Sequence, residues 1–290
     1  MKSFKDAVRH KDFAISAEIY LRPESDADSI RRQADVVRDA VDAILLTDNQ
    51  YGQVHMSTIA AASILLDYDI DPIVQLTSRN RNRIALVSDL LGAAAIGVTS
   101  LLLVAGERAP KEFQPRPKPV LDLSATDLIL TAATIKKDED LKRRPEFFIG
   151  GVVTPVGPNP NWKPRKLLEK IDAGAQFVQT HTCMDVDLLR RYMRHLIDNK
   201  LLQRTSVIGA VAVLESADDA QWLRSNRPNV MIPDAVIERL ENSANPRQEG
   251  INVCAETIRA MRDIPGIDGV SIMASKDLGS IAEAAHAASL

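Results

Sequence analysis

The side chain best suited to chemistry in the first part of the chain is Glu18. It lies in a segment, Phe13–Leu21, whose residues alternate as in a β-strand: one face carries Ile15, Ala17, Ile19 and Leu21, and the other Ser16, Glu18 and Tyr20. If the apolar face packs against helices, Glu18 points into an enclosed space, where burial raises the pKa of a carboxyl group and favours a general acid. The alternative is a structural ion pair with Arg79 or Arg81, because an enclosed carboxylate needs a partner.

Polar residues also follow other apolar segments, at positions that would be the carboxyl ends of strands. They are Thr47-Asp48-Asn49, Gln75-Leu76-Thr77-Ser78, Gly106-Glu107, Thr154 and His181. Gly106 is the most informative of them, because a glycine lets the backbone approach a planar or phosphate-bearing ligand closely. The alternative is a turn glycine followed by a solvated glutamate.

Two other chemistries are weakly represented. His181 and Cys183 are the right residue types for a metal site or a Cys/His nucleophile, but no third residue has the spacing of a zinc ligand. A Schiff-base mechanism needs a buried lysine on a strand, whereas Lys276 falls in an expected loop. We therefore predict no metal site and no thiol catalysis.

The elements that must position these residues alternate between short apolar strands and amphipathic helices. The predicted strands are Phe13–Leu21, Ala43–Thr47, Pro72–Thr77, Ser100–Gly106, Phe147–Thr154, Phe177–Thr182, Ser206–Val213 and Gly269–Ala274. The predicted helices are Ile30–Ala40, Met56–Leu66, Arg83–Ala95, Ala125–Ile135, Arg165–Ala173, Val186–Leu201, Ala217–Ser225 and Ala255–Met261. Regular alternation implies parallel strands joined by helical crossovers. Eight strands in 290 residues favour a closed (β/α)₈ TIM barrel over an open sheet.

We expect residues 1–290 to form one domain. No linker divides the chain, and a helical insertion is expected at about 232–262, before the last strand. The proline-rich stretches 115–119 and 155–164 follow the fourth and fifth strands, so they would lie on the face of the barrel where active sites are built. They would also serve as stiff surface loops.

Composition excludes several classes of protein. A net charge of −3, from 36 basic and 39 acidic residues, gives no basic footprint for nucleic acid or an anionic membrane. No apolar run is long enough for a membrane span, and the charged N-terminus lacks the apolar core of a signal peptide. Two cysteines make no disulfide framework. We expect a soluble, cytoplasmic protein.

Several segments together resemble the methylenetetrahydrofolate reductase family, from about Phe13 to Ala274 and in the family's order. They are Ala17-Glu18-Ile19-Tyr20, Thr47-Asp48-Asn49 with Val54-His55-Met56-Ser57, Gln75 to Asn82 leading into Ser88 to Ala93, Leu103-Val104-Ala105-Gly106-Glu107, Lys170 to Ala175 with Gln179-Thr180-His181, and Gly269 to Met273.

The resemblance implies a flavoprotein barrel that interconverts 5,10-methylene- and 5-methyltetrahydrofolate. It implies catalytic roles for Glu18 and Glu107, FAD contacts from Thr47, Gln75, Thr77, Ala105, Gly106, Glu107, Lys170, Ala175 and His181, and folate contacts from Glu18, Glu107 and His181. It also implies NADH or NADPH as electron donor and a homo-oligomer. Where the sequence departs from the family's pattern, Glu107 replaces an aspartate, Gln75 a histidine, His181 a glutamine and Ala105 a polar residue, so we expect FAD to bind weakly.

Two further functions stay open. The first is a folate-binding barrel without tightly held flavin, acting by direct hydride transfer from a nicotinamide or by handling methyl-folate. The second is a non-catalytic subunit of a one-carbon complex, which would gain nothing from an enclosed carboxylate at Glu18.

Overall fold

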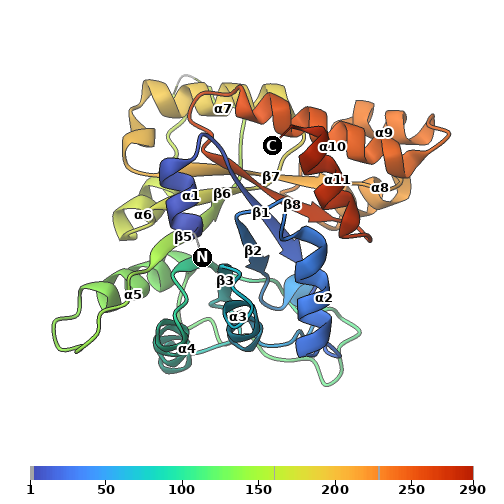
Figure 1. Ribbon diagram of the computed structural model, residues 1–290. Coiled ribbons are helices and arrows are strands. Elements are labelled where there is room, and N and C mark those ends of the chain that lie inside the picture. The colour runs from blue at the N-terminus through green and yellow to red at the C-terminus, as the bar shows by residue number, and fades with distance from the viewer. Residues whose placement is uncertain (1–2, 160, 228, 290) are drawn as a thin grey trace.

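The eight apolar segments form the wall of a closed barrel in the computed structural model, which describes residues 3–159, 161–227 and 229–289. Over these residues eight parallel strands pair in sequence order, and the last is hydrogen-bonded to the first. The strands are β1 (Ala14–Ile19), β2 (Ala43–Leu46), β3 (Pro72–Thr77), β4 (Ser100–Val104), β5 (Phe148–Val153), β6 (Phe177–Thr182), β7 (Ser206–Val213) and β8 (Gly269–Ala274). Each overlaps a predicted strand, and the predicted (β/α)₈ barrel is confirmed (Figure 1).

Helices surround this barrel. Those that follow strands β1 to β6 are α2 (Ala27–Val37), α3 (Thr58–Leu66), α4 (Arg83–Ile96), α5 (Ala125–Lys137), α6 (Arg165–Ala173) and α7 (Val186–Asp198). Strand β7 is followed by α8 (Ala217–Asn226), α9 (Asp234–Glu241) and α10 (Pro246–Arg262), and β8 by α11 (Gly279–Ala287). Two 3₁₀ turns, Gln50–Gly52 and Leu201–Gln203, lie in the connections.

Both faces of the strands are buried, as parallel sheets require. Ile15, Ala17 and Ile19 of β1 pack in the outer apolar layer between strands and helices, as their alternation predicts. On the other face Ser16 is fully buried and Glu18 lines a cavity. Tyr20 comes after the end of β1, and its hydroxyl donates to the carbonyl oxygen of Ala274 at 3.0 Å. Tyr20 therefore does not follow Glu18 into the cavity.

A short N-terminal helix, α1 (Phe4–His10), closes one end of the barrel, and its role is not apparent from the sequence pattern. Phe4 is buried, and its ring lies 5.6 Å from that of Phe177 and 6.2 Å from that of Phe148, measured between centroids. Its backbone N–H donates to the carboxylate of Asp71 at 2.6 Å. Because α1 blocks this end, the open end is the one formed by the carboxyl ends of the strands.

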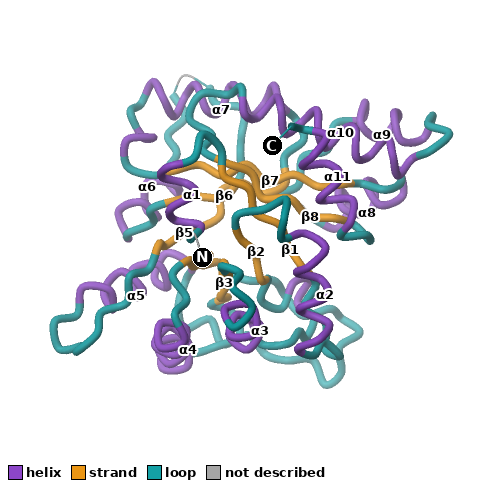
Figure 2. Tube along the Cα trace, viewed as in Figure 1, coloured by secondary structure: helices purple, strands orange, loops and turns teal. Residues whose placement is uncertain are grey.

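The region between β7 and β8 contains three helices. The long helix α10 packs against β7 and α11, which is the position of a crossover helix. Helices α8 and α9 enclose a small separate apolar cluster that includes Leu214, Leu223, Ile237 and Leu240. Long loops follow β4 and β5, visible in Figure 2 as teal segments, and they contribute to the open end of the barrel.

Candidate functional site

A cavity of about 1230 Å³ lies at the carboxyl ends of the strands. Nine of the predicted site residues line it: Glu18, Thr47, Gln75, Thr77, Ala105, Gly106, Glu107, Lys170 and His181. Ala175 does not lie with them. It is 3% exposed in the outer apolar layer, just after the end of α6 and before β6 begins, so it has no access to a ligand in this cavity. We remove Ala175 from the candidate site.

Glu18 lies in the wall of the cavity and is only 9% exposed. The side-chain amide of Gln50 donates to its Oε1 at 2.8 Å. Burial raises the pKa of Glu18 to about 7, while the Gln50 hydrogen bond and the positive charge of Arg227 oppose that rise. The side chain therefore exchanges a proton near neutral pH, as a general acid must.

The ion pair considered for Glu18 does not form. Arg81 instead makes two hydrogen bonds to the carboxylate of Asp48, at 2.6 and 3.0 Å, and lies 3.2 Å from Asp89. Arg79 donates through Nε to the carbonyl oxygen of Gly106 at 3.2 Å. Both arginines are thus engaged elsewhere, which leaves the Glu18 carboxyl with a neutral partner.

The loop after β2 brings Gln50 to Glu18 through a strained backbone. Asn49 and Tyr51 have φ angles of 51° and 60°, in the left-handed region that residues other than glycine rarely adopt. Gly52, at φ 66°, packs so closely that a Cβ atom there would lie 2.2 Å from the carbonyl oxygen of Arg108. This loop therefore packs closely against the loop after β4. Its strained backbone directs the side chains of Gln50 and Tyr51 toward the cavity.

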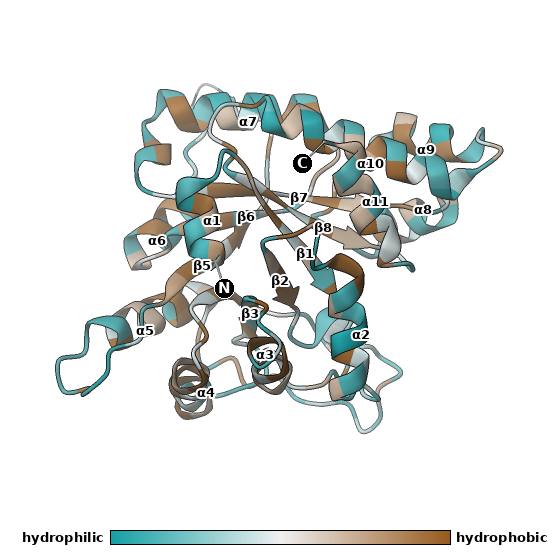
Figure 3. Cartoon of the chain, viewed as in Figure 1, coloured by the Kyte–Doolittle hydropathy of each residue, from teal (hydrophilic) through white to brown (hydrophobic). Residues whose placement is uncertain are grey.

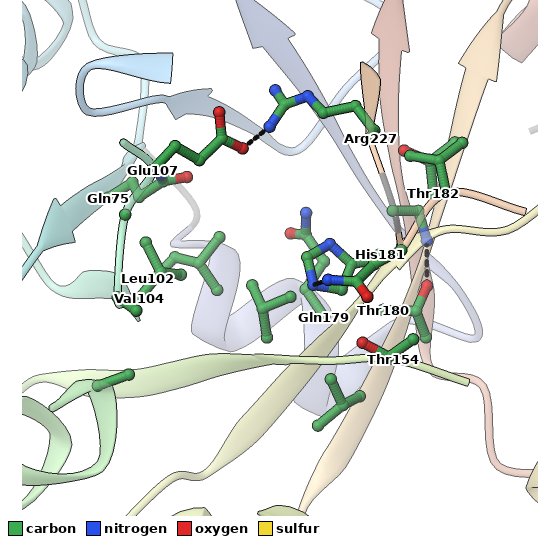
Figure 4. A pocket seen from close by; sticks show the side chains of 18 of the residues that line it. Gln75, Leu102, Val104, Glu107, Thr154, Gln179, Thr180, His181, Thr182 and Arg227 are labelled. Atoms are coloured by element: carbon green, nitrogen blue, oxygen red, sulfur yellow. Dashed lines mark hydrogen bonds and ion pairs between the residues drawn. The ribbon is translucent and has the colours of Figure 1, made fainter. Parts of the chain in front are cut away.

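Glu107 is paired with a residue that the sequence reasoning missed. Its carboxylate forms an ion pair with Arg227, across the cavity in Figure 4. The Arg227 guanidinium also lies 3.9 Å from the centroid of the Tyr51 ring, a cation–π contact, and Tyr51 packs edge-on against Trp222. The sequence offers no signal for Arg227, because it follows α8 and reaches the cavity only through the fold.

Asp48 and Thr77 form a rigid support beneath the cavity. Asp48 is 3% exposed and accepts from both the backbone N–H and the hydroxyl of Thr77, at 2.8 and 2.9 Å. Gly106 packs directly on Thr77: its φ is 82°, and a Cβ atom there would lie 2.8 Å from the Thr77 Cβ. The glycine is thus required by this contact and by its backbone conformation, whether or not a ligand is bound.

Another part of the cavity wall is basic. Lys163, Arg165, Lys166 and Lys170 line the cavity along the start and one side of α6, and none of them forms an ion pair among the described residues. Burial and the nearby charge of Lys166 lower the pKa of Lys170. Burial, and secondarily Lys170, lowers the pKa of His181, whose Nε2 lies 3.4 Å from the Asn229 side-chain amide. This wall suits an anionic group.

The alternative chemistries receive no support from the geometry. Cys183 is fully buried in the outer apolar layer, and burial raises its pKa to about 12, so it is not a thiolate. Lys276 is exposed and pairs with Asp219 at 3.0 Å, outside the cavity. Within the described ranges, no three His, Cys, Asp or Glu side chains are grouped so that they could hold a metal ion.

A sequence model of one family, described as methylenetetrahydrofolate reductase, matches residues 3–288. This match spans nearly the whole barrel. The chain belongs to the methylenetetrahydrofolate reductase family. The resemblance seen in the separate motifs is thereby confirmed, and family membership supports a folate-related function.

Solved structures show the same fold at low sequence identity. An uncharacterized protein from Clostridium thermocellum, described as binding two copies of 5-methyl-5,6,7,8-tetrahydrofolic acid, has a TM-score of 0.69 and 14% identity, over 98% of this chain and 96% of that one. A 2,3-dimethylmalate lyase of the PEP mutase/isocitrate lyase superfamily has a TM-score of 0.51 and 11% identity, over 94% of this chain and 81% of that one. The sequence matches no curated protein.

The four residues named above as departures from the motifs of the reductase family line the cavity. Gln75, Ala105, Glu107 and His181 face the same space as Glu18 and Thr47, which are retained. None of the helices in the described part of the chain has the length and apolarity needed to cross a membrane.

Proposed function

We propose that this protein interconverts 5,10-methylenetetrahydrofolate and 5-methyltetrahydrofolate by hydride transfer from or to a flavin. The observation that carries the proposal is Glu18, a nearly enclosed carboxyl group with a pKa of about 7 at the wall of a large cavity, in a chain of the reductase family. Such a group donates a proton to a bound substrate without requiring an acidic solution.

The proton has a defined destination. Methylenetetrahydrofolate holds its one-carbon unit between N5 and N10, and protonation of N10 opens that ring to an iminium at N5, which then accepts hydride. Glu18 supplies the proton, directly or through one water molecule. The side-chain amide of Gln50 donates a hydrogen bond to the Glu18 carboxylate, so it holds the acid in place and stabilises its charged form after the proton has left.

Glu107 and Arg227 provide charge where the substrate becomes cationic. The Glu107 carboxylate is neutralised by Arg227 in the structure, and both side chains line the cavity. A carboxylate beside an iminium stabilises it, so we propose that substrate binding loosens this ion pair and turns Glu107 toward the pterin. Arg227 remains held by the Tyr51 ring.

The residues present fit a flavin dinucleotide. The cavity volume of about 1230 Å³ exceeds what one drug-sized ligand requires, and its basic wall suits a diphosphate. Pro164 precedes α6 and provides no side-chain cap. The backbone N–H of Arg165 donates to the carbonyl oxygen of Lys163 at 2.8 Å, whereas the N–H groups of Lys166 and Leu167 are available to an anion. We propose that Lys170, Thr77, Gln75 and Gly106 hold the flavin, which supplies the hydride, with NADH or NADPH as its electron source.

A flavin-free alternative has a specific observation in its favour. The Clostridium thermocellum protein is described as binding two methyltetrahydrofolate molecules, and the cavity here has room for two ring systems. Ala105 also offers no side-chain hydrogen bond to a flavin. In this alternative the nicotinamide transfers hydride directly, or the protein handles methyl-folate.

Titration with FAD separates the two. Loss of two or three polar contacts, at about 1 kcal/mol each, weakens FAD binding by roughly 30- to 150-fold relative to a full set of contacts. We expect pale protein whose flavin absorbance and methylene-folate reductase activity rise together on addition of FAD, with quenching of FAD fluorescence. If FAD changes neither fluorescence nor activity while methyltetrahydrofolate still binds by calorimetry, the flavin-free alternative is correct.

A further inference from the structure

The guanidinium of Arg227 is held by two groups of different kinds. The Glu107 carboxylate forms an ion pair with it across the cavity, as Figure 4 shows, and the centroid of the Tyr51 ring lies 3.9 Å from its central carbon. The Arg227 side chain is only 18% exposed, whereas that of Glu107 is 42% exposed. Water therefore screens the charge of Arg227 poorly, and Glu107 is the partner that solvent can more easily receive when the pair opens.

The Tyr51 ring is a fixed support for this cation. Its backbone has a φ angle of 60°, and its ring packs edge-on against Trp222 of α8, with 5.3 Å between centroids. A cation over an aromatic ring is attracted to the whole face and not to one acceptor atom, so it can turn without leaving the ring. Tyr51 can therefore hold Arg227 in more than one orientation.

The strands beside Glu18 bring no charge to it. Leu45 of β2 is in register with Glu18, and β2 is brown along its length in Figure 3. On the other side, β8 contributes Met273 to the cavity wall. Tyr20, two residues further along the chain, stays neutral, because burial and the nearby charge of Glu18 raise its pKa.

Arg227 is the cation that acts on Glu18, since its charge opposes the rise in pKa that burial causes there. Seven other charged or titratable residues of the cavity wall form no hydrogen bond or ion pair with Glu18 in the part of the chain that is described: Asp48, Arg108, Lys163, Arg165, Lys166, Lys170 and His181. One cation thus serves two carboxyl groups. It is paired with Glu107 and lies near enough to Glu18 to influence it.

We propose that Arg227 exchanges partners during the reaction: it leaves Glu107 as that carboxylate turns to the substrate, and it binds Glu18 once Glu18 has lost its proton. This exchange rests on the proposed folate chemistry. Tyr51 is the pivot on which the guanidinium turns, and it is therefore a positioning residue. Gln50, the partner of Glu18, directly precedes Tyr51 in the same strained turn, so the turn holds both ends of the exchange in place.

The exchange keeps every charge in the cavity paired. Before the proton moves, Glu18 is neutral and Arg227 balances Glu107. The proton then passes from the Glu18 carboxyl to N10, the bond between N10 and the one-carbon unit breaks with its electron pair going to N10, and the lone pair of N5 forms the iminium. Glu107 now balances the iminium and Arg227 balances the new Glu18 carboxylate, so neither charge is enclosed without a partner. Addition of hydride from the reduced flavin to the iminium carbon removes the positive charge of the substrate. Reprotonation of Glu18 then returns Arg227 to Glu107.

The proton affinity of Glu18 in protein free of folate and flavin tests the exchange. Glu107→Gln removes the competing carboxylate and leaves Arg227 free to bind Glu18. A direct partner of opposite charge lowers the pKa of a carboxyl group by about one to three pH units, so the pKa of Glu18, about 7 in the wild type, should fall by that amount. The measurement is a carbon-13 NMR titration of protein labelled at the glutamate carboxyl carbons. The signal that is missing from Glu18→Gln identifies Glu18.

A cycle of variants separates exchange from simple repulsion between the two carboxylates. Loss of repulsion would also lower the pKa of Glu18 in Glu107→Gln, but it does not need Arg227. Exchange predicts that Glu107→Gln leaves the pKa of Glu18 nearly unchanged when it is added to Arg227→Gln. An equal fall with and without Arg227 would overturn the proposal. Arg227→Met, which keeps most of the side-chain length, takes the place of Arg227→Gln if circular dichroism shows the latter to be unfolded.

The matched control is Glu112→Gln. Glu112 is an exposed residue of the same loop after β4 and does not line the cavity, so the pKa of Glu18 should stay at about 7 in this variant. Tyr51→Asn removes the ring and suits a left-handed backbone, whereas Tyr51→Phe keeps the ring. Glu107→Gln should therefore lower the pKa of Glu18 less in Tyr51→Asn than in Tyr51→Phe. Equal shifts in the two would overturn the role of Tyr51 as the pivot.

These titrations do not depend on turnover, so the two proposals fail separately. If the cycle shows exchange but the protein does not reduce methylene-folate, the proposed function is wrong and the exchange stands as a property of the cavity. If the protein turns over folate but the effects of Glu107→Gln and Arg227→Gln simply add, the exchange is wrong and the proposed function stands.

Discussion

The side-chain amide of Gln50 donates a 2.8 Å hydrogen bond to Oε1 of Glu18. Two features of this relationship matter for chemistry. The partner is neutral, so it lowers the pKa of Glu18 less than an ion pair would, and burial keeps that pKa at about 7. The partner also comes from a loop with two left-handed residues, Asn49 and Tyr51, whose conformation is locked by contact with the loop after β4.

The first prediction separates the two half-reactions through Glu18→Gln. The amide keeps the shape but cannot act as an acid, and general acid catalysis contributes about 10²–10⁴-fold, so the folate half-reaction should slow by that factor. Flavin reduction by the nicotinamide, followed alone by stopped flow, needs no proton on N10 and should stay within several-fold of wild type. Equal slowing of both half-reactions, or intact folate turnover, would mean that Glu18 is structural.

The second prediction concerns stability and pH. Because the pKa of Glu18 is raised from 4.5 to about 7 in the folded state, the folded protein binds more protons at this site than the unfolded chain between these pH values. Its contribution to the free energy of unfolding therefore falls as pH rises through that window. In Glu18→Gln no group titrates at this position, so the variant does not lose this contribution as the pH rises. Its free energy of unfolding relative to wild type should therefore grow by roughly 3 kcal/mol between pH 4.5 and 7.

Urea unfolding of both proteins at pH 5 and pH 8 measures this difference. Asp71, whose pKa is also raised to about 6, is present in both proteins and cancels in the comparison. A stability difference that does not change with pH would show that Glu18 titrates normally in the folded state.

The third prediction tests Gln50 as a positioning residue. In Gln50→Leu the hydrogen bond to the Glu18 carboxylate is lost, and such a bond is worth about 1.5–3 kcal/mol to a charged group. The pKa of Glu18 should then rise by about one pH unit or more. The pH at which the folate step loses activity should move upward by the same amount, with kcat little changed below the old pKa and raised between the old pKa and the new one. An unshifted profile with a lower rate at every pH would indicate damage to the loop instead.

The fourth prediction concerns Arg227, whose charge lowers the pKa of Glu18 and neutralises Glu107. Arg227→Gln should move the pH profile of the folate step to higher pH, whereas Arg227→Lys, which keeps the charge, should move it less. The matched control is Arg224→Gln, because Arg224 lies in the same region and pairs with Asp234 at the surface. If Arg224→Gln and Arg227→Gln shift the pH profile equally, the shift results from destabilisation of α8 and not from the loss of the Arg227 charge.

The fifth prediction concerns Glu107 itself. Glu107→Gln removes the charge that a cationic intermediate needs, whereas Glu107→Asp keeps the charge on a shorter side chain. The rate of the folate step should therefore fall more in Glu107→Gln than in Glu107→Asp. Glu107→Asp should also shift the reduction potential of bound flavin, because the carboxylate withdraws by one methylene. Near-wild-type rates in both variants would make Glu107 a turn residue that only pairs with Arg227.

Local pattern determined much of the fold. The alternation around Glu18 and the apolar runs of the other strands are local features of the sequence. Parallel strands that are buried on both faces appear in a sequence as continuous apolar segments, which makes them easy to identify. The carboxyl ends of parallel strands in a barrel share one face, so the residues at these ends were expected to lie around one site. Examples are Thr47, Gln75, Gly106 and His181. Closure of the barrel follows from the same regularity.

Contacts between distant segments were decided only by the tertiary structure. Nothing near Gln50 marks it as the partner of Glu18, because its position depends on left-handed backbone at Asn49 and Tyr51, which are not glycines. Arg227 reaches Glu107 from beyond α8, and α1 closes the barrel only once Phe148 and Phe177 are assembled beneath Phe4. Ala175, by contrast, belongs to a recognisable motif yet lies outside the cavity. The sequence therefore determines which face of each strand is polar, whereas the closed barrel decides which polar groups come within hydrogen-bonding distance, because that depends on loop conformation and on packing between elements far apart in the chain.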